Sequence, residues 1–295
     1  MQRSLPLTGT RRGGGRRAGR SPARRLAVRA LAYAALTLGA VVALIPFVWM
    51  VSTSFKNLED VGNLPPQWIP HPFVTDAYPR VWAELPFLNF LVNSLYTTLC
   101  VVLGQLLTCS LSAYAFARLE FKGRDKMFYL YLATMMIPGQ VTLIPAFVLM
   151  RWLNWIDTPL ALIMPGLSSA FGVFLLRQFF LTIPRELEDA ARIDGYGLCG
   201  IYWRIILPLS KAALATLAVF TFLGSWNDFL WPFVVINTPE RMTLPVGLSF
   251  LSANHATDWP LLMAGSSLSL IPVVIVFLLA QRYFVEGIAL TGLKG

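Results

Sequence analysis

Charged residues are scarce in this chain: Asp, Glu, Lys and Arg make up 13% of its 295 residues, whereas 56% of the residues are hydrophobic. A soluble domain usually carries about 25% charged residues, so a water-soluble globular protein is excluded. The hydrophobic residues fall in long runs, and a run of about 20 crosses the ~30 Å hydrocarbon core as a helix. The alternating pattern of a membrane β-barrel is missing. The sequence therefore predicts an all-α polytopic membrane protein, whose backbone groups are hydrogen-bonded within each helix.

Cysteine is also scarce, with three in the whole chain. Cys100 and Cys109 fall in one predicted helix, about 13 Å apart along its axis, which is too far for a disulfide. The sequence contains no Cys-x-x-Cys motif and no histidine cluster. We therefore expect neither a disulfide framework nor a metal site.

Sequence motifs for catalysis and nucleotide binding are missing as well. The chain has no GxxxxGK[ST] phosphate-binding loop, no HExxH and no GxSxG, so we expect no enzymatic activity and no cofactor bound by the chain itself. Ionisable residues inside apolar spans are rare and usually functional, and Asp228 is the main candidate. No chain of Asp, Glu or His crosses the apolar stretches, which disfavours a proton relay. Uphill transport would then need energy from another polypeptide, and an ion-coupled carrier, a channel or a membrane enzyme are the alternatives.

Six apolar stretches are long enough to be transmembrane helices. The third and fifth are interrupted, by Pro138 and Pro145 and by Trp226-Asn227-Asp228 respectively. The predicted spans are Leu26–Val51, Phe90–Ala113, Met127–Met150, Leu160–Phe180, Leu209–Ile236 and Leu262–Tyr283.

The basic residues predict the orientation of these spans. Twenty of the 24 Lys and Arg residues fall on one side of the predicted membrane, and basic loops face the cytoplasm, so both termini are expected there. Residues 1–29 hold nine arginines and no acid. We interpret residues 1–25 as a disordered cytoplasmic tail that sets the topology, not as a nucleic-acid-binding segment. Residues 26–295 then form a single transmembrane domain.

The cytoplasmic loop of residues 184–208 is the longest charged segment between the apolar spans. We expect Pro184 to begin a short helix, Asp194-Gly195 to end it, and a second helix to run over residues 198–206 until Leu207-Pro208 stops it. A helix of about ten residues is not stable alone in water, so it must pack on the spans or on a partner. Asp194 lies at a helix C-terminus, where a negative charge is unfavourable. That position marks either a functional site or an ordinary Asp-Gly turn.

This loop resembles the EAA motif of permease subunits of binding-protein-dependent ABC importers. The family pattern is Glu-Ala-Ala, three residues, Gly, nine residues, Ile, one residue and Leu-Pro. Here Asp189 stands in the Glu position, and Glu188, just before it, is expected to share its role. The matching positions that follow are Ala190, Ala191, Gly195, Ile205, Leu207 and Pro208.

Other segments are similar to the carbohydrate-uptake branch of this family, the maltose-type and glycerol-phosphate-type permeases. They are Asn93-Ser94, the stretch from Ser225 to Pro232, and Gln281-Arg282-Tyr283-Phe284 with Lys294-Gly295. The resemblance implies a type I importer permease in the inner membrane of a bacterium or archaeon. It also implies a second homologous permease, two copies of a cytoplasmic ATPase that bind ATP, and an external solute-binding protein. A sugar or oligosaccharide is the implied substrate, and glycerol phosphate or a polyol is the alternative.

Polar and aromatic side chains within the predicted spans are candidates for lining a substrate path, because sugars are bound by aromatic faces and a few hydrogen-bonding groups. Near the membrane surface, tryptophan is also common as an interface residue. The candidates are Asn93, Gln105, Gln140, Trp226, Asn227 and Asp228.

Overall fold

The computed structural model describes residues 22–253 and 257–292, and all regular structure within them is helical, as the sequence predicts. The predicted tail lies outside the described residues except for residues 22–25, which begin the first helix. The α-helices are α1 (Pro22–Thr53), α2 (Ala77–Glu84), α3 (Phe87–Arg118), α4 (Arg124–Ala133), α5 (Gly139–Trp152), α6 (Pro159–Ile163), α7 (Ala170–Thr182), α8 (Glu186–Ile193), α9 (Leu198–Ile201), α10 (Leu207–Leu209), α11 (Lys211–Trp226), α12 (Leu230–Val235), α13 (Leu244–Ala253) and α14 (Trp259–Gly292). Between them lie the 3-10 helices η1 (Leu58–Asp60), η2 (Thr134–Met136), η3 (Met164–Gly166) and η5 (Pro239–Arg241), and a π-helical turn, η4 (Tyr202–Ile206).

Four helical segments in the described part of the chain are long and apolar enough to cross a membrane, and the number is six when each of two bent helix pairs counts as one span. Each of the six predicted spans overlaps one of the four segments or one of the two bent pairs. The count of six stays a prediction. The four segments are Val28–Thr53, Phe87–Arg118, Pro159–Thr182 and Trp259–Gln281.

The third predicted span is not a straight helix. The segments Arg124–Met136 and Gly139–Trp152 meet at an angle of 98°. Pro138 lies at the break with an extended backbone, at ψ 134°. A proline has no N–H to continue the helical ladder and restricts the residue before it, so the chain changes direction there. Pro145, by contrast, is accommodated inside α5.

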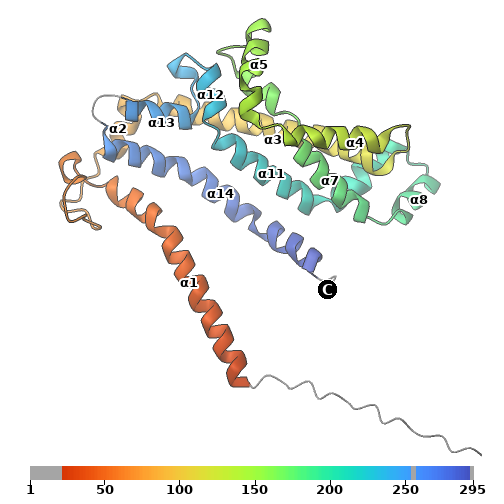
Figure 1. Ribbon diagram of the computed structural model, residues 1–295, viewed down its shortest axis with the longest axis horizontal. Coiled ribbons are helices and arrows are strands. Elements are labelled where there is room, and N and C mark those ends of the chain that lie inside the picture. Colours follow the sequence, from red (N-terminus) through yellow and green to blue (C-terminus); the bar gives the residue numbers. More distant parts are fainter. Residues whose placement is uncertain (1–21, 254–256, 293–295) are drawn as a thin grey trace, which may run out of the picture. The chain divides into compact units, whose positions relative to one another are not determined.

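The chain divides into two units, residues 1–49 and residues 50–295. The second unit contains every element from α2 onward. Within it α3 packs against α7 and α11, α11 packs against α14, and α2 packs against the N-terminal part of α14 (Figure 1). Helix α3 runs from the end that holds α2 and α13 to the end that holds α8 (Figure 1), so one helix connects the two ends of the unit.

Helices α6 and α7 are separated by the 3-10 helix η3 and by the irregular residues 167–169, and polar side chains of α3 bond to the backbone carbonyls there. Gln105 donates to the Gly166 carbonyl at 2.8 Å, and Thr108 donates to the Leu167 carbonyl at 2.5 Å. Carbonyls released by a helix break need other partners inside a membrane. The break is therefore stabilised from the neighbouring helix.

The segment before α13 is held on the first turns of α3. The Asn93 amide donates to the carbonyls of Glu240 (2.9 Å) and Met242 (3.1 Å). The Ser94 hydroxyl accepts the backbone N–H of Leu244 at 2.7 Å. The resemblance singled out Asn93-Ser94 as a family-like segment, and its polar atoms have a packing role in this structure.

Candidate functional site

The loop that follows α7 forms a helix pair. Helix α8 begins at Glu186, so Pro184 precedes the helix by two residues and is not its first residue. Gly195 has φ +84°, the left-handed conformation that glycine adopts without strain, and the helix ends there as the sequence predicts. The N–H of Gly195 donates to the Arg192 carbonyl (3.0 Å), and the N–H of Tyr196 donates to the Ala191 carbonyl (2.9 Å). These two bonds close the helix as a Schellman motif.

The second part of the pair is longer than the sequence predicts. Helix α9 continues into the π-helical turn η4 and then α10, so the helical segment passes Pro208 and ends at Leu209, where the chain bends by 77° into α11. The N–H of Leu207 donates to the Tyr202 carbonyl and closes the π turn. This wider turn precedes a proline that has no N–H to donate, which explains why Leu207-Pro208 does not end the helix.

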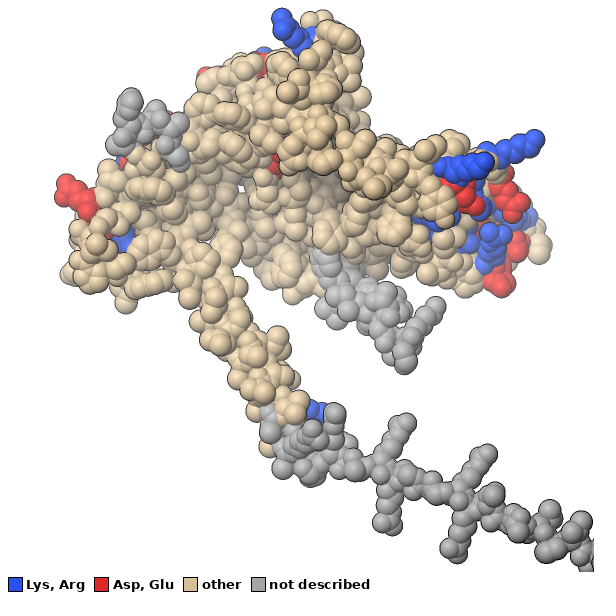
Figure 2. All heavy atoms as spheres, in the orientation of Figure 1, with Lys and Arg blue, Asp and Glu red and all other residues tan. Residues whose placement is uncertain are grey.

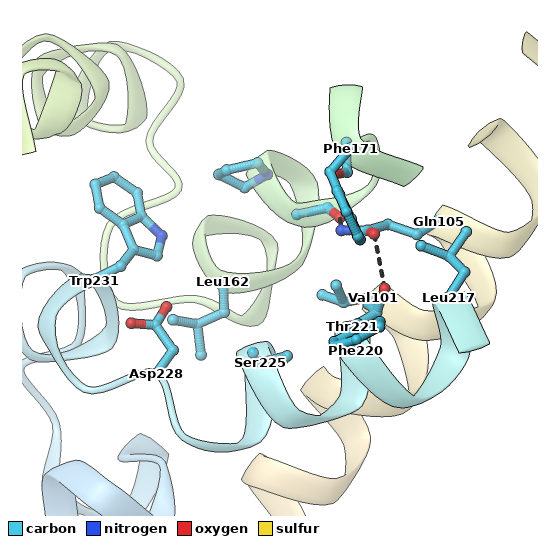
Figure 3. A pocket seen from close by; sticks show the side chains of 14 residues that line it. Val101, Gln105, Leu162, Phe171, Leu217, Phe220, Thr221, Ser225, Asp228 and Trp231 are labelled. Atoms are coloured by element: carbon cyan, nitrogen blue, oxygen red, sulfur yellow. Dashed lines mark hydrogen bonds between the residues drawn. The ribbon is translucent and has the colours of Figure 1, made fainter. Parts of the chain in front are cut away.

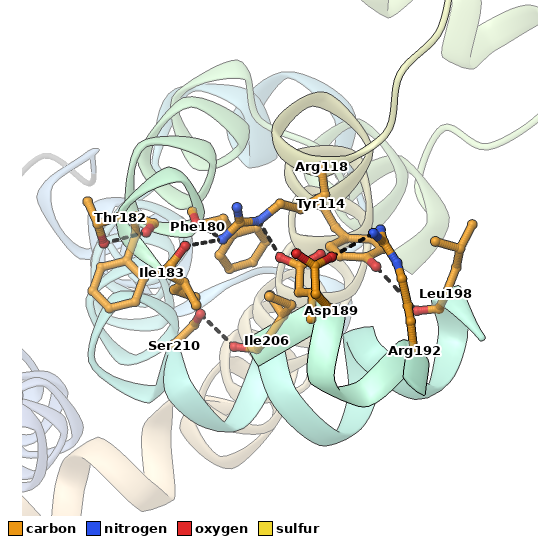
Figure 4. A network of polar contacts seen from close by, with 12 residues as sticks. Tyr114, Arg118, Phe180, Thr182, Ile183, Asp189, Arg192, Leu198, Ile206 and Ser210 are labelled. Carbon is orange, nitrogen blue, oxygen red and sulfur yellow. Dashed lines mark hydrogen bonds and ion pairs between the residues drawn. The ribbon is translucent and has the colours of Figure 1, made fainter. Parts of the chain in front are cut away.

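The two neighbouring acids of the EAA-like motif face opposite ways. Glu188 is buried, and its Oε1 lies 2.8 Å from Nε of Arg118 at the end of α3. Nη2 of Arg118 donates to the carbonyls of Phe180 and Ile183, each at 2.6 Å. Asp189 points outward and pairs with Arg192 one turn along, at 3.1 Å (Figure 4).

Helix α3 contacts the helix pair through three residues spaced four apart, which places them on one face of the helix. The Ser110 hydroxyl lies 2.7 Å from the Tyr202 hydroxyl. The Tyr114 ring packs on Tyr202 with centroids 5.3 Å apart, and its hydroxyl reaches the Leu198 carbonyl at 3.4 Å. Arg118 completes the row. A displacement of the helix pair would therefore act directly on α3.

The outer face of the helix pair exposes apolar side chains. Ile193 is 86% exposed and Trp203 is 58% exposed, although apolar side chains of this size are usually covered. Leu187, Tyr196 and Leu198 of the same helix pair and its turn are exposed as well. Figure 2 shows that Lys, Arg, Asp and Glu side chains gather at the end of the second unit where α8 lies. An apolar patch with a charged rim is typical of a protein–protein contact surface.

The motif positions divide between these two faces. Ala191 is buried in a core cluster that includes residues of α3 and α7, Ile205 and Leu207 are partly covered, and Ala190, Asp194, Gly195 and Pro208 are exposed. Apart from its own chain neighbours, no atom lies within 4 Å of the place that a Cβ at Gly195 would occupy. A β-carbon there would therefore point into open space.

A cavity of about 410 Å³ lies between α3, the irregular segment before α7, and α11 (Figure 3). Gln105 and Asp228 both line it, so the structure brings together two of the six predicted path residues. The Gln105 carbonyl oxygen accepts the Thr221 hydroxyl at 2.9 Å. Trp231 lines the cavity on the side of Asp228, and its indole N–H donates to the Ala161 carbonyl (2.8 Å). Asp228 faces the backbone N–H groups of Leu230 and Trp231 at the start of α12.

The other path candidates lie elsewhere. Trp226 is 2% exposed, stacks on Phe222 at 5.5 Å and donates to the Ser269 carbonyl (3.2 Å), so it is a packing residue in this structure. Asn227 is exposed and bonds to its own helix at Leu223. Asn93 lines a separate cavity of about 340 Å³ beside α6, and Gln140 is exposed on α5.

Sequence reasoning missed Arg118, Tyr202 and Thr221. Arg118 is one of the basic residues that predict the orientation, and the available signal was its place at the cytoplasmic end of a predicted span, on the same predicted side of the membrane as the acids of the 184–208 loop. Tyr202 and Thr221 lie in apolar surroundings, and their partners are about a hundred residues away in the chain.

Comparison with known proteins relates the whole fold to transport. Residues 106–289 match the model of the family described as "Binding-protein-dependent transport system inner membrane component". The arabinooligosaccharides transport system permease protein AraQ of Halalkalibacterium halodurans is 36% identical over 87% of this chain and 93% of its own length. The sn-glycerol-3-phosphate transport system permease protein UgpE of Yersinia enterocolitica is 37% identical over 85% of this chain and 92% of its own length.

Solved structures of ABC transporter chains are similar to this fold. A chain from the crystal structure of a bacterial ABC transporter involved in the import of the acidic polysaccharide alginate superposes with a TM-score of 0.77 at 27% identity, over 90% of this chain and 98% of that chain. A chain from the alginate transporter in complex with a periplasmic protein that carries an alginate pentasaccharide has a TM-score of 0.65 at 14% identity, over 86% of this chain and 94% of that chain, which shows the shared fold. The chain therefore belongs to the family of inner-membrane permease components of binding-protein-dependent transport systems.

Proposed function

We propose that this chain is one permease subunit of an ATP-driven importer, and that a cytoplasmic ATPase docks on the helix pair formed by α8 and α9. The exposed apolar side chains of Ile193 and Trp203 carry this proposal, because charged residues gather at the same end of the unit and the ion pair of Glu188 and Arg118 joins the helix pair to α3. The sequence has no phosphate-binding loop of its own. ATP is accordingly bound and hydrolysed by the partner, in two copies.

The remaining partners follow from the same reading. A second, homologous permease completes the translocation path, and an external solute-binding protein delivers the solute on the side opposite the helix pair. Both termini lie in the cytoplasm, which the placement of basic residues supports. The outward-facing segments around α2 and α13 then face the binding protein.

The substrate is a sugar or oligosaccharide. The cavity supplies aromatic rings from Phe171, Phe220 and Trp231 together with the hydroxyl and amide groups of Thr221 and Gln105, the combination that binds sugar rings. The similarity to AraQ supports this class. The similarity to UgpE favours glycerol phosphate as the second candidate.

The test is reconstitution. The chain is purified with its second permease and placed in vesicles with and without the ATPase, and uptake of radiolabelled solute is followed with the binding protein present. Uptake that requires the ATPase and ATP is expected. Uptake by the permeases alone, driven by an ion gradient, would instead support a carrier or channel and overturn the proposal.

Substitution of Gly195 tests the docking surface. The φ of +84° disfavours a β-branched residue, whereas asparagine tolerates this region. Gly195→Asn should leave the isolated chain folded because no atom of the chain lies within 4 Å. We expect Gly195→Asn and Gly195→Val to remain in the membrane and to lose ATPase binding or transport. Normal co-purification and transport by Gly195→Val would show that the ATPase docks elsewhere.

A further inference from the structure

We propose that the cavity between α3, α7 and α11 is a charge-selective solute path, which admits neutral polyhydroxylated solutes and disfavours anionic ones. The inference rests on the proposed function, because it specifies which class of sugar passes through the permease. Three features of the cavity carry it: the broken backbone that lines it, its hydrogen-bonding groups and its single ionisable side chain.

Two breaks in membrane helices meet at this cavity. Pro165 and Gly166 belong to the 3-10 helix η3, Ser169 belongs to the irregular segment that follows it, and Asp228 belongs to the non-helical segment between α11 and α12. Non-helical backbone at membrane depth occurs where it is buried in protein or lines a water-filled space. Discontinuous helices also form the substrate sites of many transporters. The convergence of the two helix breaks of this chain distinguishes the cavity from a packing defect.

The wall offers groups suited to hydroxyl-rich ligands. Thr221, Gln105 and the Gly166 carbonyl form a connected set of hydrogen bonds of 2.9 and 2.8 Å, which fixes the amide of Gln105 in place. Phe171 and Phe220 pack edge to face with ring centroids 5.9 Å apart. Aromatic faces beside oriented neutral dipoles are typical of sugar sites.

The charge of the wall has one sign. Among the fourteen lining residues, all within the described part of the chain, Asp228 is the single ionisable side chain. A smaller cavity of about 20 Å³ shares Asp228, Ser225 and Trp231 and is otherwise lined by apolar residues and by Ser and Thr. Phosphate and carboxylate ligands are usually bound by Arg, Lys or free backbone N–H groups. A carboxylate in a wall of low dielectric instead repels them.

The relatives differ in the charge of the solutes that their names and titles give. The name of AraQ refers to arabinooligosaccharides, which are neutral. UgpE is named for a phosphate ester, and the alginate transporter imports an acidic polysaccharide. Although the overall identities to AraQ and UgpE are nearly equal, the cavity favours a neutral solute of the first kind.

Charged thiol reagents provide the test, with the assembled importer in vesicles. Ser225→Cys places a thiol in the cavity wall, and Gln140→Cys places one on the exposed surface of α5 as the matched control. Cys100→Ala and Cys199→Ala remove the accessible native thiols, while Cys109 is fully buried and is left in place. Labelling rates are measured with methanethiosulfonates that carry either a trimethylammonium or a sulfonate group.

At each position, the labelling rate with the cationic reagent is divided by the labelling rate with the anionic reagent. The measured quantity is this ratio at Ser225→Cys divided by the same ratio at Gln140→Cys. We expect a value of about tenfold or more, the low end of the enrichment produced by a cleft of one charge sign. Asp228→Asn should bring it close to one, and Asp228→Glu, which keeps the charge, should preserve it. Modification of Ser225→Cys should also stop ATP-driven uptake, and modification of Gln140→Cys should not.

The charge selectivity would be overturned if the protein that keeps Asp228 gave a normalised ratio of about one. It would also be overturned if Asp228→Asn left the ratio unchanged. Uptake that continues after Ser225→Cys is fully modified would show that the solute passes elsewhere. Both results would leave the proposed function standing, provided that the importer still hydrolyses ATP and takes up solute. Failure of the chain to assemble with an ATPase would overturn the proposed function itself.

Discussion

Arg118 and Glu188 form a buried ion pair, with Nε and Oε1 2.8 Å apart and side chains that are 3% and 4% exposed. Nη2 of Arg118 donates hydrogen bonds to the carbonyls of Phe180 and Ile183 at the end of α7. One guanidinium therefore joins the ends of α3 and α7 to the start of α8. A buried pair contributes little net stability compared with an apolar replacement, because both charges lose water. Its value here is that it fixes the position of the helix pair relative to α3.

Removal of one partner should be costly. Glu188→Gln leaves the buried guanidinium of Arg118 without its counter-charge, and we expect a loss of about 3–5 kcal/mol in the stability of the cytoplasmic end. Thermal unfolding of the detergent-solubilised chain measures this loss. Asp189→Asn is the matched control, because its carboxylate is exposed and pairs with Arg192 on the surface, where ion pairs contribute little.

The same pair of variants tests the assignment of roles within the motif. We expect Asp189→Asn to fold normally and to affect binding of the ATPase, and Glu188→Gln to affect the fold first. If Asp189→Asn lowered the unfolding temperature of the isolated chain more than Glu188→Gln, the separation of the two acids into outer and inner roles would be wrong.

The contacts between α3 and the helix pair differ in strength. The Ser110–Tyr202 hydroxyl pair is short at 2.7 Å, whereas the bond from Tyr114 to the Leu198 carbonyl is long at 3.4 Å, and hydrogen bonds weaken with length. Tyr202→Phe should therefore cost about 1 kcal/mol, and Tyr114→Phe should be close to neutral. Ser110 also donates to the Leu106 carbonyl, so Tyr202→Phe leaves its hydroxyl satisfied. Chemical or thermal unfolding of the two variants provides the comparison, and a larger effect of Tyr114→Phe would contradict this ranking.

Local rules predicted the local features of this chain. The left-handed Gly195, the all-helical fold and the family-like loop follow from residue type, apolar run length and motif spacing. The break at Pro138 was predictable as an interruption, but its angle of 98° was not, since it depends on packing partners far along the chain.

The sites were predicted less well because they depend on long-range contacts. Glu188 and Asp189 are adjacent in sequence and chemically alike, and only the arrival of Arg118 from α3 makes one of them buried. Trp226 and Asp228 are two residues apart, yet one packs on Phe222 and the other faces the cavity. The helix α11 ends at Trp226, so Asp228 lies in the non-helical segment that follows it.

Two helical glycines offer a matched test of packing. A Cβ at Gly172 of α7 would lie 2.9 Å from Sγ of Cys109 on α3 and 3.0 Å from a methyl carbon of Leu217 on α11, whereas a Cβ at Gly224 would have no atom within 4 Å. Gly172→Ala should therefore destabilise the contact between α3, α7 and α11 by about 1–3 kcal/mol. Gly224→Ala should be neutral or stabilise α11 by up to about 1 kcal/mol, through helix propensity. The unfolding temperatures of both variants in detergent test this, and equal shifts would mean that the three helices are not closely packed at Gly172.

The loop after α5 carries a pH-dependent contact on the side opposite the helix pair. Asp157 accepts the backbone N–H groups of Asn237 (3.0 Å) and Thr238 (2.9 Å) and the Thr238 hydroxyl (2.5 Å), and it pairs with Arg241 at 3.3 Å. Partial burial alone would raise the pKa of this carboxyl, but the bonds from Thr238 and Asn237 and the charge of Arg241 outweigh it, so the pKa lies below its ordinary value of 3.8.

The sign of the effect follows from this lowered pKa. The unfolded chain binds the proton more readily than the folded chain, so the contact contributes its full stability above a pH of about 5 and loses it as the pH falls below about 4. The stability difference between the unchanged protein and Asp157→Asn should be constant near neutral pH and should shrink on acidification. Unfolding temperatures of both proteins across this range measure the difference. Thr238→Val, which removes the hydroxyl donor, should reduce both the difference and its pH dependence, whereas a difference that stays constant down to pH 3 would show that Asp157 does not titrate in this contact.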